Sequence, residues 1–140
     1  MLRQAIPAPL GFSREDRAIA VRHAGRLAHE FASTPAISIV ALISPYRDER
    51  LKVREIHEEA GLHFVEVFMN TPLETCIKRD PKGLYRRALN GEIDHFTGLD
   101  DPYEAPLNPE VSLHSSDDAN ENIAALIGFL EAAQVIDALP

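Results

Sequence analysis

The sequence predicts an α/β fold built around a parallel sheet, and three observations support this. Segments with apolar residues at helical spacing alternate with short apolar segments, as when helices connect the strands of a sheet. Residues 36–43 are apolar on both faces, like a strand buried inside a parallel sheet. The chain has 140 residues, 45% of them hydrophobic, which suits one domain and is too few for two well-filled ones. We therefore expect a single domain over residues 1–140.

Two helices are expected in the first half of the chain. The first covers residues 14–32, because apolar side chains recur there at helical spacing and Ser13 stands three positions before Asp16, a capping arrangement. The second covers residues 48–60, and Gly61 follows it as a left-handed cap.

Three shorter or later helices are expected after these. One begins after Thr71-Pro72, where a capping hydroxyl precedes a proline at the first helical position, and it ends near Asp80. The other two cover residues 84–89 and 118–133.

Strands are expected at residues 36–43, 63–69 and 110–114. Residues 91–109 are rich in Gly, Pro, Asp and aromatic residues and show neither a helical nor a strand period. A loop of this length in a compact domain usually serves as a lid or binding loop, or is disordered.

Charge and composition exclude several functions. The 14 Lys and Arg residues against 22 Asp and Glu give a formal charge of −8, so no broad basic surface is expected for nucleic acid. No apolar stretch approaches the roughly 20 residues that span a bilayer, and the N-terminus lacks the pattern of a secretory signal. The lone Cys76 fits a reducing cytoplasm, and we expect it to be a small core residue rather than a nucleophile.

Two polar features are compatible with a ligand site. Four cations, Arg79, Lys82, Arg86 and Arg87, stand close to a predicted helix break, where they suit either polyphosphate oxygens or a solvated helix face. Ser44 follows the strand predicted at 36–43, at the end where open α/β sheets bind ligands, but a serine before a proline also ends strands without any function.

Aromatic residues and histidines leave further alternatives. Phe12, Phe96 and Tyr103 lie in loop-like segments, where a ring can stack on a nucleobase or simply hold the loop in place. The six histidines are scattered without the spacing of a zinc helix, so no metal site is expected from them.

Four blocks, read together, resemble the adenylyl-sulfate kinase family and occur in the same order. They are LGFSREDR at 10–17, ISPYR at 43–47, DPKGLY at 80–85 and FTGLDDPYEAP at 96–106. The resemblance runs from about Arg3 to the last helix. It implies the three-layer, parallel-sheet fold of P-loop kinases. It also implies transfer of the γ-phosphoryl of ATP, carried with Mg²⁺, to the 3′-hydroxyl of adenylyl sulfate in sulfate assimilation.

The resemblance also implies roles for individual residues. Phe12 and Phe96 are expected to sandwich the adenine of adenylyl sulfate, and Arg3 and Arg17 to hold its phosphosulfate. The Ser44 residue and the backbone of Ile43 are expected to contact the same substrate.

The nucleotide side of the implied site uses a second set of residues. Arg79 and Lys82 are expected to steady ATP and the charge that develops on the transferred phosphoryl. Thr97, Gly98 and Leu99 are expected to belong to the same nucleotide and lid region. The segment from Leu99 to residue 106 is expected to close over the substrate and exclude water.

The sequence also departs from the family pattern. A P-loop requires Gly-x-x-x-x-Gly-Lys-Ser/Thr, and none of the lysines Lys52, Lys78 and Lys82 follows a glycine. No catalytic residue is therefore assigned, and the central P-loop strand of the family is expected to be lacking, because Met1 aligns partway through the stretch that follows it.

Three single positions differ as well and weaken the expected substrate contacts. Ala20 stands where the family usually has Asn, Pro9 where it has Asp, and Asp94 where it often has Lys.

Two interpretations follow. One is a cytoplasmic adenylyl-sulfate kinase of which this sequence is a part; the other is a non-catalytic remnant or an adenylyl-sulfate-binding module. A sheet without its central strand leaves unpaired edges, so we expect the gap to close by strands that slide together, by formation of a homodimer or by a complementing chain. Small-molecule nucleotides are the other expected partners, with neither nucleic acid nor membrane.

Overall fold

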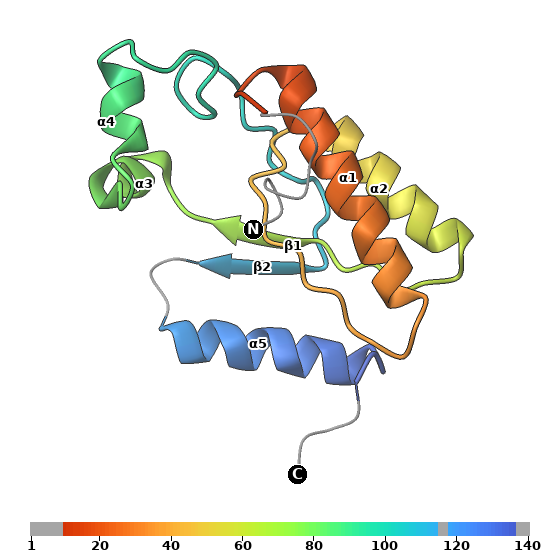
Figure 1. Ribbon diagram of the computed structural model, residues 1–140. Helices are drawn as coiled ribbons and strands as arrows, with labels where there is room; N and C mark the ends of the chain where they lie inside the picture. The colour runs from red at the N-terminus through yellow and green to blue at the C-terminus, as the bar shows by residue number, and fades with distance from the viewer. Residues whose placement is uncertain (1–9, 115–117, 137–140) are drawn as a thin grey trace. The chain divides into compact units, whose positions relative to one another are not determined.

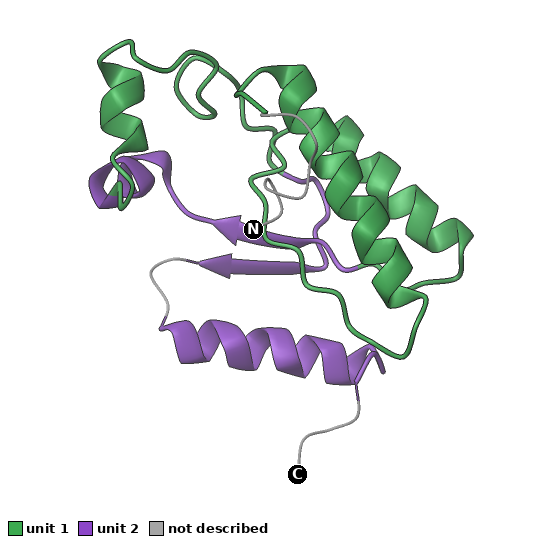
Figure 2. Ribbon diagram, viewed as in Figure 1, with its two compact units in different colours: residues 1–64, 80–105 green, residues 65–79, 106–140 purple. Residues whose placement is uncertain are grey.

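The computed structural model describes residues 10–114 and 118–136. The chain divides into two compact units, one formed by residues 1–64 and 80–105 and the other by residues 65–79 and 106–140 (Figure 2). The described elements are helices together with a parallel pair of strands, so the α/β prediction is confirmed.

The first unit contains two helices that lie side by side, α1 (Arg14–Ala32) and α2 (Arg47–Glu59) (Figure 1). The predicted start of α1 is confirmed, because the Ser13 hydroxyl accepts a hydrogen bond from the Asp16 amide at 3.2 Å. Helix α2 begins one residue earlier than predicted, and Gly61 follows it at φ 71°, in the left-handed region that glycine adopts without strain.

A close approach and a buried ion pair join α1 to α2. A Cβ placed on Gly25 of α1 would lie 2.7 Å from a methyl carbon of Val53 on α2, so this contact admits only a glycine at its present spacing. Beside it, the buried carboxylate of Glu49 accepts from Arg22 at 3.1 Å and from Lys52 at 2.7 Å. These two cations offset the cost of removing the Glu49 charge from water.

Residues 36–43 correct the sequence prediction. They form no strand in the part of the chain that the structure describes, and their side chains are exposed: Ile39 by 87%, Ile37 and Ile43 by 57% each. The segment has the composition of a strand covered on both faces, but a strand also needs hydrogen-bonded neighbours. The apolar composition shows that the segment suits a buried strand between two other strands. The described residues do not provide those neighbouring strands.

The second unit contains the sheet. Strands β1 (Val67–Asn70) and β2 (Val111–His114) are parallel, in a register that pairs Val67 with Val111, and α5 (Ala119–Ala132) packs against β2. Two of the three predicted strands are therefore confirmed, although β1 begins four residues after its predicted start. Helix α5 begins with a capping box between Asp118 and Glu121.

Two short helices complete the described elements. Helix α3 (Leu73–Arg79) belongs to the second unit, and α4 (Leu84–Leu89) has its predicted bounds in the first. Cys76 is only half-buried, and α3 has no fully buried side chain, so its expected place in a core is not reached. No helix in the described ranges is both long and apolar enough to cross a membrane.

Candidate functional site

An aromatic cluster in the first unit joins three of the four sequence blocks. The Phe96 side chain is 7% exposed and lies at its centre. The Tyr85 ring of α4 meets the Phe96 ring edge-on, with centroids 4.9 Å apart, and the Phe12 ring lies 6.1 Å away at an interplanar angle of 47°. Residues far apart in the sequence thus form one apolar surface.

Arg17 fixes the loops that carry this cluster. Its Nε donates to the Phe12 carbonyl at 3.0 Å and its Nη2 to the His95 carbonyl at 3.2 Å, while the guanidinium lies 5.6 Å from the Phe12 ring centroid. The side chain is buried. A positive charge therefore lies beside the Phe12 ring and bonds the residue that precedes Phe96.

The two phenylalanine rings touch each other at their present separation. A flat base between parallel faces needs two carbon contacts, about 7 Å in total. At 6.1 Å and a 47° tilt, Phe12 and Phe96 leave no room for one. A sandwich of adenine therefore requires the two rings to move apart, and Phe12 is the less buried of the two.

Residues 95–101 form a tight turn around Asp100. Its carboxylate accepts from the His95 amide at 2.7 Å and from the Phe96 amide at 2.6 Å. These two hydrogen bonds lower the pKa of Asp100, because they stabilise its charged form. Gly98 supplies the positive φ of 91° that the turn needs, and its amide donates to the Asp101 carbonyl at 2.7 Å. The turn sets the direction of Phe96 and Thr97.

Thr97 presents a buried hydroxyl to this region. The residue is 8% exposed, and among the described residues its Oγ1 has no hydrogen-bond partner. A buried hydroxyl without a partner costs on the order of 1–3 kcal/mol, which a ligand that bonds it can recover.

A second group of contacts joins the remaining block to this loop. The Tyr46 side chain is 1% exposed, and its hydroxyl donates to the Asp101 carboxylate. Burial, and then this hydrogen bond to a carboxylate, raise the pKa of Tyr46 to about 12. The Arg14 guanidinium lies 4.0 Å from the Tyr46 ring centroid, a cation–π contact from the first turn of α1.

Ser44 lies two residues before Tyr46 in the same block. Its φ of 42° is unusual for a residue other than glycine, and its carbonyl accepts from Arg50 Nη1 at 2.6 Å. Ile43 before it is 57% exposed.

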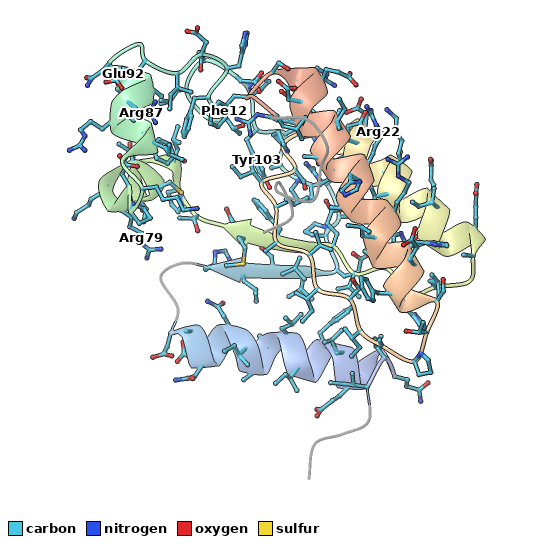
Figure 3. The ribbon with its side chains drawn as sticks, viewed as in Figure 1. Phe12, Arg22, Arg79, Arg87, Glu92 and Tyr103 are labelled. Carbon is cyan, nitrogen blue, oxygen red and sulfur yellow. The ribbon has the colours of Figure 1, made fainter. Side chains whose placement is uncertain are left out.

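The cationic residues lie at the end of α3, in the turn after it and within α4. Arg79 and Lys82 are exposed, and Arg87 pairs with Glu92 at 3.1 Å (Figure 3). Asp80 lies among them and caps α4, accepting from the amides of Tyr85 at 3.1 Å and Arg86 at 3.0 Å. The pKa of Asp80 is lowered: desolvation raises it, but hydrogen bonds from three backbone amides and the Arg86 charge together outweigh that effect. One of the four cations is thus committed to a surface ion pair.

The other predicted positions are placed as follows. Arg3 and Pro9 lie outside the described residues. Ala20 is buried within α1, and Asp94 is exposed in the loop before the aromatic cluster. The described residues include no cluster of three or more His, Cys, Asp or Glu side chains that could hold a metal ion.

Sequence reasoning missed three features of this region: the Tyr85 ring against Phe96, the buried Thr97 hydroxyl and the Arg50 bonds. Tyr85 is part of a recognised block, so its place in the site could have been expected. No local pattern distinguishes Arg50 from its neighbours on a charged helix.

Comparisons with known proteins agree with this arrangement. The model of the adenylylsulphate kinase family matches residues 1–114. An adenylyl-sulfate kinase of Saccharomyces cerevisiae is 45% identical over 126 residues, covering 90% of this chain and 62% of the yeast protein. One of Myxococcus xanthus is 51% identical over 112 residues, covering 80% of this chain and 60% of that relative.

The solved structures give the same result for the fold. The structure of the Mycobacterium tuberculosis APS kinase CysC in complex with AMPPNP and APS matches with a TM-score of 0.88 and 43% identity, covering 93% of this chain and 75% of that one. The fold is therefore the P-loop-kinase fold of that enzyme, over the part that this chain spans. The chain spans 60–62% of the length of the yeast and Myxococcus relatives. A family match over residues 1–114, together with this structural likeness, shows that the chain belongs to the adenylylsulphate kinase family.

Proposed function

We propose that this chain supplies the adenylyl-sulfate-binding part of an adenylyl-sulfate kinase. In the reaction, the 3′-hydroxyl oxygen of adenylyl sulfate attacks the γ-phosphorus of ATP. The bond from that phosphorus to the β–γ bridging oxygen breaks, and the hydroxyl proton is released. The products are ADP and 3′-phosphoadenylyl sulfate, an intermediate of sulfate assimilation.

The observation that carries this proposal is the meeting of the four sequence blocks in one unit. Phe12, Tyr85 and Phe96 form the aromatic cluster, and Tyr46 bonds Asp101 at the other end of the same loop. If the four blocks lay on separate parts of the surface, their side chains would not contact one another in this way. The identity of 43–51% to kinases of this family favours the kinase interpretation over a non-catalytic remnant.

The substrate roles follow from the chemistry of each group. Phe12 and Phe96 offer ring faces to the adenine, and Arg17 places a buried cation beside them for the phosphosulfate. Arg3 is proposed to hold the same anion. The Ser44 hydroxyl and the backbone of Ile43 are proposed to supply the remaining polar contacts.

The ATP side is proposed from fewer groups. Exposed Arg79 and Lys82 are suited to phosphate oxygens, and the segment from Thr97 through Gly98 to Leu99 is proposed to close on the bound substrates. Mg²⁺ is proposed to travel with ATP, and no step is assigned to the metal.

Domain organisation and partners are also proposals. We treat residues 1–140 as one kinase domain, because the family match runs through both compact units. A second copy or a complementing chain is proposed to cover the exposed apolar segment at 36–43. A reducing, cytoplasmic location is proposed from the single, unpaired Cys76.

Calorimetric titration of the 140-residue chain tests the proposal. Adenylyl sulfate should bind more tightly than ATP, because its base and anion have contacts here and the sequence contains no P-loop motif. Arg17→Ala should weaken adenylyl sulfate binding about tenfold or more. Arg26→Ala, an exposed position on the same helix, is the matched control and should change little. Equal affinity for the two nucleotides, or equal losses in the two variants, contradicts the proposal.

A further inference from the structure

Arg50 connects two segments that are far apart in the sequence. From the first turn of α2, its Nη1 donates to the Ser44 carbonyl at 2.6 Å and its Nη2 to the Glu104 carbonyl at 2.7 Å. The side chain is half-buried, and its guanidinium lies 6.0 Å from the Tyr103 ring centroid. Both terminal nitrogens of the guanidinium therefore donate to backbone carbonyls.

Other hydrogen bonds join the same two segments. The Glu104 amide donates to the Pro45 carbonyl at 2.8 Å, and the Glu104 carboxylate accepts from the Arg47 amide at 2.8 Å. The Tyr46 hydroxyl bonds Asp101 a few residues earlier in the loop. These hydrogen bonds join residues 101–105 to residues 44–47, and Arg50 donates a hydrogen bond to each segment.

The Ser44 backbone gives this arrangement a local consequence. A φ of 42° is strained for a residue with a Cβ, and such a conformation persists only when its surroundings hold it. The Arg50 hydrogen bond to the Ser44 carbonyl is a contact of this kind.

We propose that Arg50 is a positioning residue for adenylyl sulfate binding. It holds the Ser44 backbone in its left-handed conformation and fixes the 101–105 segment at the same time, so that the serine and the loop after Phe96 keep one relative position. The identity of the ligand rests on the function proposed above; the positioning itself rests on the hydrogen bonds.

The geometry also explains why an arginine is needed. A guanidinium is a rigid planar fork whose two terminal nitrogens can serve two acceptors at once. A lysine ammonium at the same place is a point donor on a flexible stem, and it can satisfy one carbonyl while losing the other.

The first test compares variants of two arginines on α2 by titration with adenylyl sulfate and by thermal unfolding. Arg50→Gln should lower the affinity about tenfold, and Arg50→Lys should remain within about threefold of that loss. Arg54→Gln is the matched control: Arg54 lies one turn later, pairs with Glu58 and stacks on Phe64. Equal losses for Arg50→Gln and Arg54→Gln, or full recovery in Arg50→Lys, overturn the assignment.

The second test is a double-mutant cycle with Ser44→Gly. Glycine adopts positive φ without strain, so it no longer needs to be held. Arg50→Gln should therefore cost less in the Ser44→Gly background than the loss of about tenfold expected in the parent chain, and the loss that remains belongs to the Glu104 contact. An undiminished loss overturns the assignment.

A third measurement separates this inference from the proposed function. Hydrogen–deuterium exchange in the ligand-free chain reports the Glu104 and Arg47 amides directly. Arg50→Gln should speed their exchange while Arg54→Gln leaves it unchanged. If the chain does not bind adenylyl sulfate but this exchange pattern is found, the proposed function fails and the positioning role stands. Unchanged exchange in Arg50→Gln overturns the positioning role even where the ligand binds.

Discussion

Phe96 occupies the centre of the proposed adenine site, and its replacement measures what stacking contributes there. Phe96→Ala should weaken adenylyl sulfate binding by roughly 1–3 kcal/mol, the range found when an aromatic residue that stacks on a base is truncated. Isothermal titration gives the difference directly.

The control for Phe96 is Phe31→Ala, near the end of α1. Phe31 is 62% exposed and lies outside the aromatic cluster, so its truncation should leave the affinity unchanged. Similar losses in both variants would place the adenine elsewhere.

Tyr46 gives the first unit a dependence on alkaline pH. Its pKa is raised from 10.0 to about 12 in the folded chain. The folded state therefore retains this proton more firmly than the unfolded state, and the stabilisation is complete below pH 10 and lost as the pH rises toward 12.

Tyr46→Phe tests this assignment through the free energy of unfolding. At pH 7 the variant should be less stable by about 1–3 kcal/mol, because the Asp101 carboxylate loses a buried donor. Its stability should then fall less steeply than that of the parent chain between pH 10 and 12. Tyr103→Phe, at a side chain 40% exposed, is the control. A parallel decline in the parent chain and Tyr46→Phe argues against the hydrogen bond as the source.

Sequence reasoning reached the residues of the site but not their partners. Phe12, Arg17 and Phe96 were selected through a family resemblance, and the structure brings them together. The bonds made by Arg50 could not be expected, because they depend on how the loop at 101–105 folds back onto α2. Neither Ser44 nor Glu104 shares a helical or strand pattern with Arg50, so the sequence pattern does not indicate these contacts.

At the scale of the elements, the contact between α1 and α2 depends on Gly25. Alanine normally stabilises a helix by about 1 kcal/mol relative to glycine. Here its Cβ would meet the Val53 methyl groups at 2.7 and 2.8 Å, and a β-branched side chain has little freedom to turn away. Gly25→Ala should therefore lower the free energy of unfolding by about 1–3 kcal/mol in denaturant titrations.

Gly128 is the matched control for this substitution. It lies within α5, and the space around its added Cβ is open to 4 Å. Gly128→Ala should stabilise the chain by up to about 1 kcal/mol through helix propensity alone. If Gly25→Ala is stabilising as well, the two helices are not in close contact at that point.

The elements were predictable to different degrees. Helices with strong caps or clear periods, such as α1 and α4, have their expected bounds, because the signals that start and stop a helix are local. The strand predicted at residues 36–43 is not formed, for the opposite reason. A strand is defined by hydrogen bonds to other strands, and the composition of one segment cannot supply them.

At the scale of the whole molecule, two effects on self-association oppose each other: the exposed apolar segment at 36–43 favours it, and the net charge disfavours it. Five apolar side chains there are between 37% and 87% exposed, whereas the formal charge of −8 opposes association of copies. Salt screens charge repulsion but leaves apolar attraction in place. Self-association of the 140-residue chain should therefore increase when salt is added.

Ile39→Lys tests whether this segment causes the association. Ile39 is 87% exposed, so the substitution should change the free energy of unfolding by less than about 0.5 kcal/mol while it breaks the apolar surface. Sedimentation velocity over a range of concentrations should show a smaller average mass than for the parent chain. Leu107→Lys is the control, because Leu107 is 76% exposed but stands outside this run of apolar residues. A loss of stability above about 2 kcal/mol in Ile39→Lys would show that the side chain is buried in solution. Equal effects of the two lysines on association would show that net charge alone controls it.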